Sequence, residues 1–424
     1  MRWLWLTLAD PEPATNGQLI YSKGLIGAAA NAGASLTVIG LARPERQRAA
    51  NDPTVMDWRL AKERPKPAWR RLLSRDPTLT QRTSPALTQM LDRALAETRW
   101  DAVVFDSLCA GWALHAVLRN RAHNPQPPRL VYVAHNHEAT VARRIAASAR
   151  GLRGVAKRVD RLRTIWLERR LVLVADVVTS NAPEDCERFA KDAGGRAILY
   201  LPPGYDGPRI AGRVIDGSVA RSAILVGSLD WPPKRMAVES FLQVAARRLA
   251  EAGVTLRIVG EVQQTYLDGL RKRFPSVDFV GRVEDVRPYL REARLALVPD
   301  MLGGFKLKGL DYVFHRLPIL AMRGALPGMP LEDRQSFALF DSHEEMARGV
   351  LALIDDFATL NAWQDRAYAA CADEFECAAN DSQSTPQTIR EGRRLVQRFS
   401  GEDGRELWCG HDHAHALFVL FSHV

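Results

Sequence analysis

The sequence predicts an α/β protein built from two doubly wound, largely parallel sheets, and three observations carry this prediction. Short apolar runs alternate with helical patterns along almost the whole chain. The apolar runs are continuous, which is typical of strands that are buried on both faces of a parallel sheet. A stretch rich in proline and glycine, residues 201–220, reads as an interdomain linker and divides the series into two halves.

The first half opens with the order strand, loop, helix, strand. The apolar run Trp3–Leu8 is followed by the turn-forming stretch Pro11–Gly17, and a helical pattern then continues to Gly33. The next apolar run is Ser35–Gly40. Residues 45–83 are polar, basic and interrupted by proline, so we expect them to be an excursion from the core. Later buried strands are predicted at residues 102–105, 130–134, 176–179 and 197–201.

The second half repeats the same alternation. Its predicted strands are residues 223–226, 256–259, 277–280, 295–298, 317–321 and 337–340. Its predicted helices are residues 235–252, 264–274, 344–355 and 360–375. We therefore expect domains at residues 1–205 and 206–380, followed by a tail at 381–424 that is partly helical or disordered. In such folds ligands bind at the carboxyl ends of the strands.

Composition narrows the range of partners. The net charge of +9 and the pI of about 9.5 favour an anionic partner: a nucleotide diphosphate, an acidic membrane surface or a nucleic acid. No nucleic-acid-binding module is recognisable, so we expect no nucleic-acid partner. The five cysteines are odd in number and widely spaced, which fits a reducing compartment. No apolar run approaches the ~18 residues of a spanning helix. We expect a cytoplasmic protein, with peripheral contact to an anionic inner membrane face as a further hypothesis.

A set of ordered segments in the second half carries a family resemblance. They are residues 226–234, 256–260, 280–286, 297–300, 303–311 and 317–321. In the first half, the loop Pro11–Gly17, the motif His135–Glu138 and Glu168 before Ala175–Ser180 add to it. In order and spacing these segments resemble the retaining, family 4-like (group 1) glycosyltransferases of the GT-B fold. The resemblance covers roughly residues 1–375 and implies two Rossmann-like domains facing a central cleft.

The glycine-rich turn at residues 303–311 opens a predicted helix, where backbone amides and the helix dipole form a seat for a diphosphate. The predicted donor-binding residues are Gly227, Lys234, Arg235, Arg282, Gly303, Gly304, Phe305, Lys306, Leu307, Lys308 and Asp311. The resemblance implies that Asp311 holds the ribose and that Lys308, with Lys234 or Lys306, stabilises the leaving diphosphate. It also places the family's first acid at Gly303, which has no side chain to contact the donor sugar.

The first half supplies the expected acceptor side. His135 follows a predicted strand, and the resemblance implies that it contacts the donor sugar or the acceptor in catalysis. Asp106 follows another strand, and we expect Asn16 and Gly17 to lie in the same acceptor or sugar region. No cofactor and no metal site are expected, because the spacing of Cys409–His415 matches no zinc pattern and the resembled family meets the diphosphate charge with cations.

Residues 141–170 carry ten Lys/Arg against Asp160 and Glu168. Their apolar residues Val155, Val159, Leu162, Ile165 and Trp166 recur at helical spacing. We expect this stripe to pack on the sheet. The alternative is that the basic amphipathic helix lies on an anionic membrane and gathers a lipid-diphosphate acceptor.

The predicted function is transfer of a sugar, with retention, from a nucleotide-diphosphate sugar to a saccharide or lipid-linked acceptor in polysaccharide or glycoconjugate biosynthesis. Two other classes of protein stay open. One is a sugar-nucleotide epimerase on the same scaffold. The other is a non-catalytic, degenerate GT-B binding protein, which is considered because Gly303 stands where the family has its first acid. A nicotinamide dehydrogenase is disfavoured because no G-x-G-x-x-G follows an early strand.

Overall fold

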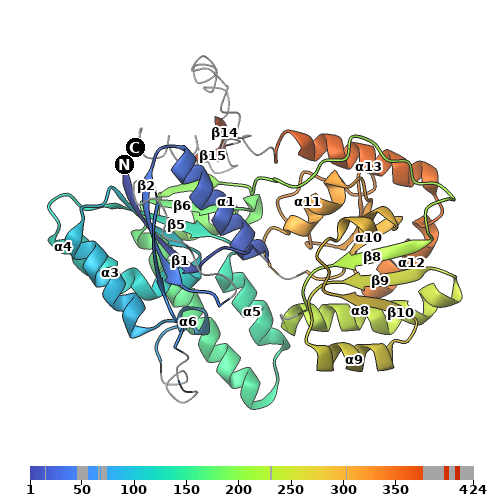
Figure 1. Cartoon of the computed structure of the whole chain (residues 1–424), viewed down its shortest axis with the longest axis horizontal. Helices are drawn as coiled ribbons and strands as arrows, with labels where there is room; N and C mark the ends of the chain where they lie inside the picture. Colours follow the sequence, from blue (N-terminus) through green and yellow to red (C-terminus); the bar gives the residue numbers. More distant parts are fainter. Residues whose placement is uncertain are drawn as a thin grey trace. The chain divides into compact units, whose positions relative to one another are not determined.

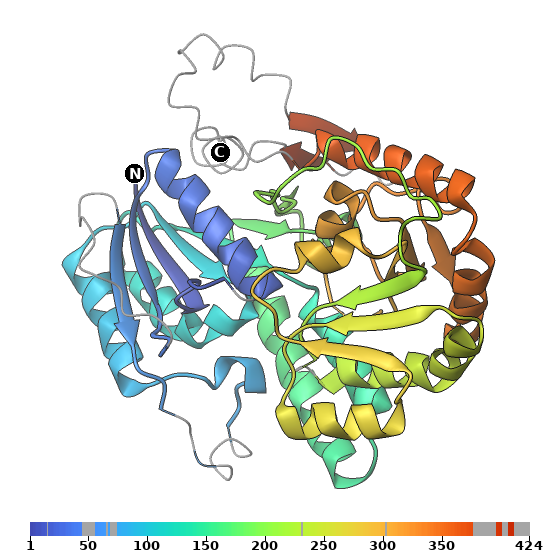
Figure 2. The same cartoon turned by 45° about the vertical axis from the view of Figure 1, so that its right-hand side comes forward.

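The computed structural model describes residues 1–14, 16–44, 56–64, 67, 74–229, 232–301, 303–375, 396–400 and 406–410. The chain forms two compact units (Figures 1 and 2), one of Met1–Gly204 with Cys377–Val424 and one of Tyr205–Glu376. Each unit is an α/β fold around a parallel sheet, which confirms the predicted fold class. Within the described residues, no helix has the length and apolar character needed to cross a membrane.

The sheet of the first unit has the strand order β14-β15-β7-β6-β5-β4-β1-β2-β3. Its parallel strands are β1 (Arg2–Ala9), β2 (Ser35–Leu41), β3 (Met56–Ala61), β4 (Ala102–Asp106), β5 (Arg129–Ala134), β6 (Val177–Ser180) and β7 (Ala197–Tyr200). Its helices are α1 (Gly17–Asn31), α3 (Pro85–Glu97), α4 (Leu114–His123), α5 (Glu138–Ser148), α6 (Gly151–Val174) and α7 (Pro183–Asp192), with short 3₁₀ turns at Thr78–Thr80 and Leu108–Ala113.

Strand β1 shows why the strands of this sheet read as continuous apolar runs. Trp3 and Trp5 pack into the hydrophobic core beneath α1 on one face. Leu4 and Leu6 pack into the core on the opposite face, which α3, α4 and α6 cover (Figure 1). Because both faces of the sheet are buried, successive side chains must all be apolar.

One predicted excursion from the core contains a strand. Within residues 45–83, β3 pairs in parallel with β2, with Leu36 opposite Met56 and Leu41 opposite Ala61. As an edge strand, β3 is only half-buried and carries the ion pair of Arg59 with Asp57 at 2.8 Å. The expectation of an excursion is wrong here, because an edge strand does not need a continuous apolar run. Residues 45–55, 65–66 and 68–73 of this segment lie outside the described residues.

The chain returns to the first unit at its end. Strands β14 (Val396–Ser400) and β15 (Glu406–Gly410) form an antiparallel pair, and β15 runs parallel to β7 with Trp408 opposite Leu199. The expectation of helix in the tail did not foresee these two strands. The cluster His411–His415 lies outside the described residues.

The second unit has the strand order β10-β9-β8-β11-β12-β13. Its strands are β8 (Ser222–Val226), β9 (Thr255–Val259), β10 (Val277–Gly281), β11 (Leu295–Val298), β12 (Ile319–Met322) and β13 (Ala338–Phe340). Its helices are α8 (Pro232–Glu251), α9 (Gln264–Arg273), α10 (Arg287–Arg291), α11 (Leu307–Phe314), α12 (His343–Leu353) and α13 (Phe357–Ala372).

Much of the predicted linker, residues 201–220, is bound to the second unit. The guanidinium of Arg209 donates to the carbonyls of Ala372 and Phe375 at 2.7 and 2.9 Å. Ile215 is fully buried in the core of this unit, and its amide donates to Asn361 at 2.9 Å. The chain therefore passes into the second unit near residue 204, before most of the predicted linker, and returns to the first unit after residue 376.

Helix α6 corrects a further expectation. Leu167, Leu171 and Val172 of this helix pack on the sheet, whereas the apolar stripe at Val155, Val159, Leu162 and Trp166 is exposed. The prediction that this stripe packs on the sheet is wrong because α6 has two apolar faces, and the helix can turn only one of them to the core.

The strand orders locate the sites at which ligands are expected. In each sheet the order of connections reverses beside the first strand, between β1 and β4 in the first unit and between β8 and β11 in the second. Open α/β sheets bind ligands at the carboxyl ends of strands at such a reversal. Gly227 follows β8 and Asp300 lies just after β11, while Asp106 ends β4.

Candidate functional site

Two glycines at the carboxyl ends of β8 and β9 bring their backbones together. A Cβ on Gly260 would overlap the carbonyl of Gly227, so glycine is required at this close approach. Gly227 has a φ of +127°, and its amide donates to the carbonyl of Val259 at 2.8 Å. A Cβ on Gly227 would in turn overlap the ammonium of Lys234. The turn therefore presents bare backbone with a lysine ammonium lying directly over it.

Asp300 is the centre of a lysine cluster in the second unit. Its two carboxylate oxygens lie 2.9 Å from the Nζ of Lys306 and 2.9 Å from the Nζ of Lys308. Burial by itself would raise the pKa of Asp300, which is 4% exposed, but the attraction of Lys308, Lys306 and Lys234 outweighs it and holds that pKa well below its usual range. One carboxylate thus faces three cations, and the cluster keeps a positive charge.

The cluster lies at the beginning of α11. Lys306 is the N-cap residue of this helix and Lys308 is in its first turn, where amides without intrahelical partners concentrate positive potential. Gly303 has a φ of +103°, and a Cβ there would have only the Nζ of Lys306 within 4 Å, at 3.8 Å. Gly304 is buried, while Phe305 packs against Phe375 with ring centroids 5.4 Å apart and Leu307 packs on the core.

Asp311 lies one helical turn after Lys308, but its carboxylate has a different partner. The hydroxyl of Tyr205 donates to it at 3.1 Å, and the Tyr205 ring stacks on Phe314 with centroids 4.6 Å apart. Burial raises the pKa of Asp311 to about 6; the hydrogen bond from Tyr205 opposes this shift, and the nearby Asp206 adds to it. The structure therefore provides a half-buried carboxylate that exchanges its proton close to neutral pH.

The two arginines predicted at the donor site are engaged in other contacts. Arg235 donates to the carbonyl of Leu229 and lies over the ring of Tyr266, 4.6 Å from its centroid. Arg282 is mostly exposed and lies 3.4 Å from Glu261. The structure thus gathers Lys234, rather than these arginines, around Asp300.

The first unit has a buried acid–imidazole pair. His135 Nε2 and Asp106 Oδ1 are 2.6 Å apart, and Trp5 Nε1 donates to the second oxygen of Asp106 at 3.1 Å. Burial raises the pKa of Asp106, but His135, Trp5 and Ser22 together outweigh this effect and lower it below its usual value. Tyr21 packs edge-on against the His135 ring, with centroids 5.0 Å apart. Asp106 and His135, at the carboxyl ends of β4 and β5, are therefore held in place by their mutual contact, by Trp5 and by Tyr21.

Several polar atoms next to this pair lack protein partners. His135 Nδ1, Ser180 Oγ and Asn181 Oδ1 are buried and have no hydrogen-bond partner in the part of the chain that the structure describes. Ala134 of β5 is in register with Ser180 of β6, so His135 and Asn181 are neighbours at the carboxyl edge of the sheet. Buried polar atoms without partners are costly, and a bound ligand or water is the ordinary way to satisfy them.

Asn16 and Gly17 form the start of α1. The Asn16 side chain caps the helix by accepting from Leu19 N at 3.1 Å, and Gly17 is the first helical residue. In the first turn, Gln18 Nε2 donates to Ser107 Oγ at 3.3 Å. The beginning of α1 is thereby held against the loop that follows β4 and Asp106.

Glu168 supports the loop after β5, a role that sequence reasoning did not assign. Its two oxygens accept from the amides of Glu138 and Ala139, both at 2.7 Å, and so cap α5 from α6. Burial raises the pKa of Glu168 to about 8; the charge of Glu138 adds to this shift, while the two amide hydrogen bonds oppose it. The spacing of Glu168 before the strand at Val177–Ser180 was the available signal.

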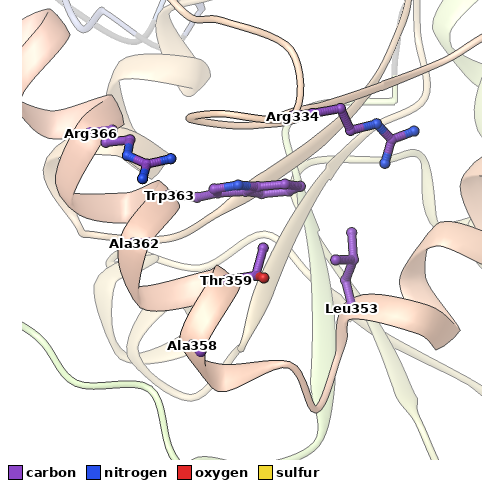
Figure 3. A pocket seen from close by; sticks show the side chains of 7 residues that line it. All are labelled: Arg334, Leu353, Ala358, Thr359, Ala362, Trp363 and Arg366. Atoms are coloured by element: carbon purple, nitrogen blue, oxygen red, sulfur yellow. The ribbon is translucent and has the colours of Figure 1, made fainter.

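A separate surface depression of about 570 Å³ lies beside α13. In Figure 3, Trp363 lies between the side chains of Arg334 and Arg366, and Leu353, Ala358, Thr359 and Ala362 complete the lining. None of these seven residues is a predicted site residue. Across the described residues, the structure gathers no group of three or more His, Cys, Asp or Glu side chains that could hold a metal ion.

Comparison with protein families gives one match. Residues 220–356, which lie in the second unit, match the model of the family described as glycosyl transferases group 1. This range contains Gly227, the lysine cluster and Asp311. A search among curated proteins found no match.

Several solved structures resemble the chain in fold. A sucrose-phosphate synthase from Thermosynechococcus elongatus is 15% identical, with a TM-score of 0.66 over 89% of this chain and 95% of that one. WaaG, a glycosyltransferase involved in lipopolysaccharide biosynthesis, is 16% identical, with a TM-score of 0.61 over 87% and 95%. Anabaena HepE in complex with UDP-glucose is 15% identical, with a TM-score of 0.58 over 89% and 96%. At these low identities the structural similarity shows the fold alone, which is that of the GT-B glycosyltransferases.

Proposed function

We propose that the protein is a glycosyltransferase of the retaining, family 4-like type. It transfers a sugar from a nucleotide-diphosphate sugar to a saccharide or lipid-linked acceptor in polysaccharide or glycoconjugate biosynthesis. The observation that carries the proposal is the convergence of Lys306 and Lys308 on the single carboxylate of Asp300, with Lys234 close enough for its charge to act on that carboxylate. The match of residues 220–356 to glycosyl transferases group 1 supports it.

The charge of the cluster suits a diphosphate leaving group. Three lysines against one carboxylate leave a net charge of about +2, and the first turn of α11 adds its dipole. As the bond to the sugar breaks, negative charge grows on the diphosphate, so cations held in place beforehand stabilise the transition state more than the ground state. Lys308 is the residue to which we assign the catalytic part of this role, and Gly227 and Gly304 offer backbone close to the phosphates.

Asp311 is the proposed ribose ligand. A carboxylate accepts hydrogen bonds from two adjacent hydroxyl groups, and Tyr205 already orients one of its oxygens. Gly303 leaves space where the resembled family has its first acid. We propose that the donor sugar is therefore held by groups other than an acid at this position.

The acceptor side is proposed for the first unit. His135 is held by Asp106 through Nε2, so its Nδ1 is the ring atom left to bond a sugar or acceptor hydroxyl. Ser180 and Asn181 present further unpartnered oxygens beside it. Asn16 and Gly17 at the start of α1 complete the proposed acceptor region.

The test is a thermal-shift panel of UDP, GDP, ADP, dTDP and CDP, each with magnesium and with EDTA. A ligand that binds only the folded protein raises the apparent melting temperature by mass action. We expect one diphosphate to raise it clearly and equally in both conditions, because the lysines rather than a metal meet the phosphate charge. If no nucleotide raises it, the donor site is refuted.

The selected nucleotide then decides between the classes of enzyme. Incubation of its sugar conjugates with an acceptor extract should give a glycosylated product, whose anomeric configuration by NMR reports retention or inversion. Nucleotide binding without turnover would instead identify a non-catalytic binding protein, the alternative that the missing acid at Gly303 leaves open. Isomerised nucleotide sugar in the absence of acceptor would identify an epimerase.

A further inference from the structure

Helix α6 carries an apolar stripe that is exposed among the residues that the structure describes. The exposed fractions of the side chains in this stripe are 55% for Val155, 41% for Val159, 60% for Leu162, 58% for Trp166 and 41% for Leu173. Their spacing of three, four or seven residues places them on one side of the helix. The stripe spans about 27 Å of helix at 1.5 Å per residue. Most other exposed large apolar residues, such as Val214 and Met236, lie singly elsewhere.

Basic side chains border this stripe on both sides. With each residue turning the helix by about 100°, Arg158 and Arg169 fall beside one edge of the stripe and Arg163 and Arg170 beside the other. Arg170 also lies over the ring of Trp166, 5.2 Å from its centroid. An apolar centre with a cationic border is the pattern of helices that lie in the interface of an anionic bilayer.

The two acids of α6 do not offset the positive charge beside the stripe, because both accept hydrogen bonds from other parts of the first unit. The carboxylate of Asp160 accepts from the amide and the hydroxyl of Thr78, at 2.7 and 2.8 Å. Glu168 is buried and caps α5. The exposed basic side chains of α6, which are Arg153, Lys157, Arg158 and Arg169, therefore dominate its outward electrostatic potential.

We propose that the α6 stripe, defined as Val155, Val159, Leu162, Trp166 and Leu173, docks the protein onto an anionic lipid surface. The apolar side chains enter the boundary between headgroups and acyl chains, and the bordering arginines contact the lipid phosphates. This surface lies in the first unit and uses none of the residues that we assign to the nucleotide. It goes beyond the proposed sugar transfer and stands or falls separately from it.

Charge complementarity selects this occupant over a second copy of the chain. Two α6 surfaces placed face to face would bring arginines of both borders together, and like charges at close range oppose association. A nucleic acid would satisfy the arginines but would leave the aliphatic side chains Leu162 and Val155 exposed to water. An anionic membrane satisfies both parts of the surface at once.

The experiment is flotation of the full chain with vesicles of phosphatidylcholine alone or mixed with phosphatidylglycerol, at low and at high ionic strength. We expect binding to the anionic vesicles at low ionic strength, and weaker binding as salt screens the arginines. The double substitution Leu162→Ser with Trp166→Ser should lower binding by about tenfold or more, since it removes the two most exposed large apolar side chains of the stripe. The control, Val214→Ser in the second unit, replaces an apolar residue that is even more exposed (72%) and should bind like the unaltered protein.

Retained melting temperature shows that the double variant is folded. If unaltered protein does not float with anionic vesicles, or if the double variant and the control bind alike, the proposal is overturned. Light scattering after size-exclusion chromatography tests whether a second copy of the chain binds the stripe. A dimer that the double substitution dissociates would assign the stripe to a second copy and would also overturn the lipid proposal. Failure of lipid binding with a clear nucleotide shift would leave the donor site intact.

Discussion

The ammonium of Lys308 lies 2.9 Å from one carboxylate oxygen of Asp300, and both groups are largely buried. A buried pair of this kind is costly to assemble unless its remaining hydrogen-bonding capacity is used. Here the second oxygen of Asp300 is taken by another lysine. The carboxylate thus holds cations near one another that would otherwise repel, and it keeps them in place before any ligand arrives.

Replacing Lys308 tests whether the cluster binds phosphate. Lys308→Ala should lower the affinity for the selected nucleoside diphosphate by about tenfold to a hundredfold, since it removes one charge-assisted hydrogen bond. Isothermal titration calorimetry measures this change. Lys272→Ala, which removes an exposed lysine of α9, should leave the affinity unchanged. Equal affinities in the two variants would contradict the proposed role of Lys308.

A methyl group at Gly227 tests the position of Lys234. The added Cβ would meet the ammonium of Lys234, so Gly227→Ala should displace this lysine and weaken nucleotide binding. The positive φ also costs the variant about 1–2 kcal/mol of stability. Gly253→Ala is the control for that strain, because its φ is +69° and its added Cβ meets only Arg221, at 3.6 Å. Weaker binding in Gly227→Ala alone is expected; weaker binding in both would show that strain is the cause.

The raised pKa of Asp311 predicts a pH dependence of stability. The folded protein keeps a proton on this carboxyl up to about pH 6, whereas an unfolded carboxyl loses it near pH 4. The stabilisation is therefore complete below about pH 4 and is lost as the pH rises through 6, a change of about 1–3 kcal/mol. Urea unfolding between these pH values measures it. Asp311→Asn should flatten the profile relative to Asp268→Asn, an exposed carboxylate on α9. Identical profiles would show that Asp311 titrates normally.

The pair of His135 with Asp106 predicts an unequal response to substitution. His135→Ala leaves the Asp106 charge buried without its main partner and should cost about 3–5 kcal/mol of unfolding free energy. The double variant with Asp106→Asn also removes the charge, so it should recover part of that loss. Binding of the nucleoside diphosphate alone should not change, because its proposed ligands lie in the second unit. Simple additivity of the two substitutions would refute coupling between them, and His123→Ala on α4 serves as an exposed histidine control.

The strands that the sequence predicts are those buried on both faces. Runs such as Ala102–Phe105 and Leu295–Val298 are short, continuous and apolar, which fits the middle of a parallel sheet. Strand β3 escapes the same reasoning, since Asp57 and Arg59 pair with each other at the sheet edge. For α6, periodicity identified an apolar stripe, but the sequence does not say which of two apolar faces turns to the core.

The sequence predicts those site residues that lie in the loop directly after a predicted strand or before a predicted helix. Lys306 and Lys308 were recognised from the turn that precedes α11. Asp300 was not assigned a role, although its position two residues after β11 at the reversal of strand order was a usable signal. Its importance comes from contacts with residues six and eight positions away, and only the folded loop shows them. In the same way, the sequence does not show that the side-chain oxygens of Ser180 and Asn181 are buried without a hydrogen-bond partner among the described residues.

The hydrogen bond from Trp5 to Asp106 gives the first unit an optical reporter. An indole whose N–H donates to a carboxylate changes its emission when the charge of that carboxylate or of its imidazole partner changes. Any molecule that contacts His135 should therefore alter the fluorescence of Trp5 without an attached dye. The chain has ten tryptophans, so the signal is the difference between the unaltered protein and Trp5→Phe. A library of unlabelled sugars can be screened against this difference, and a responding compound would be a candidate ligand of the His135 site.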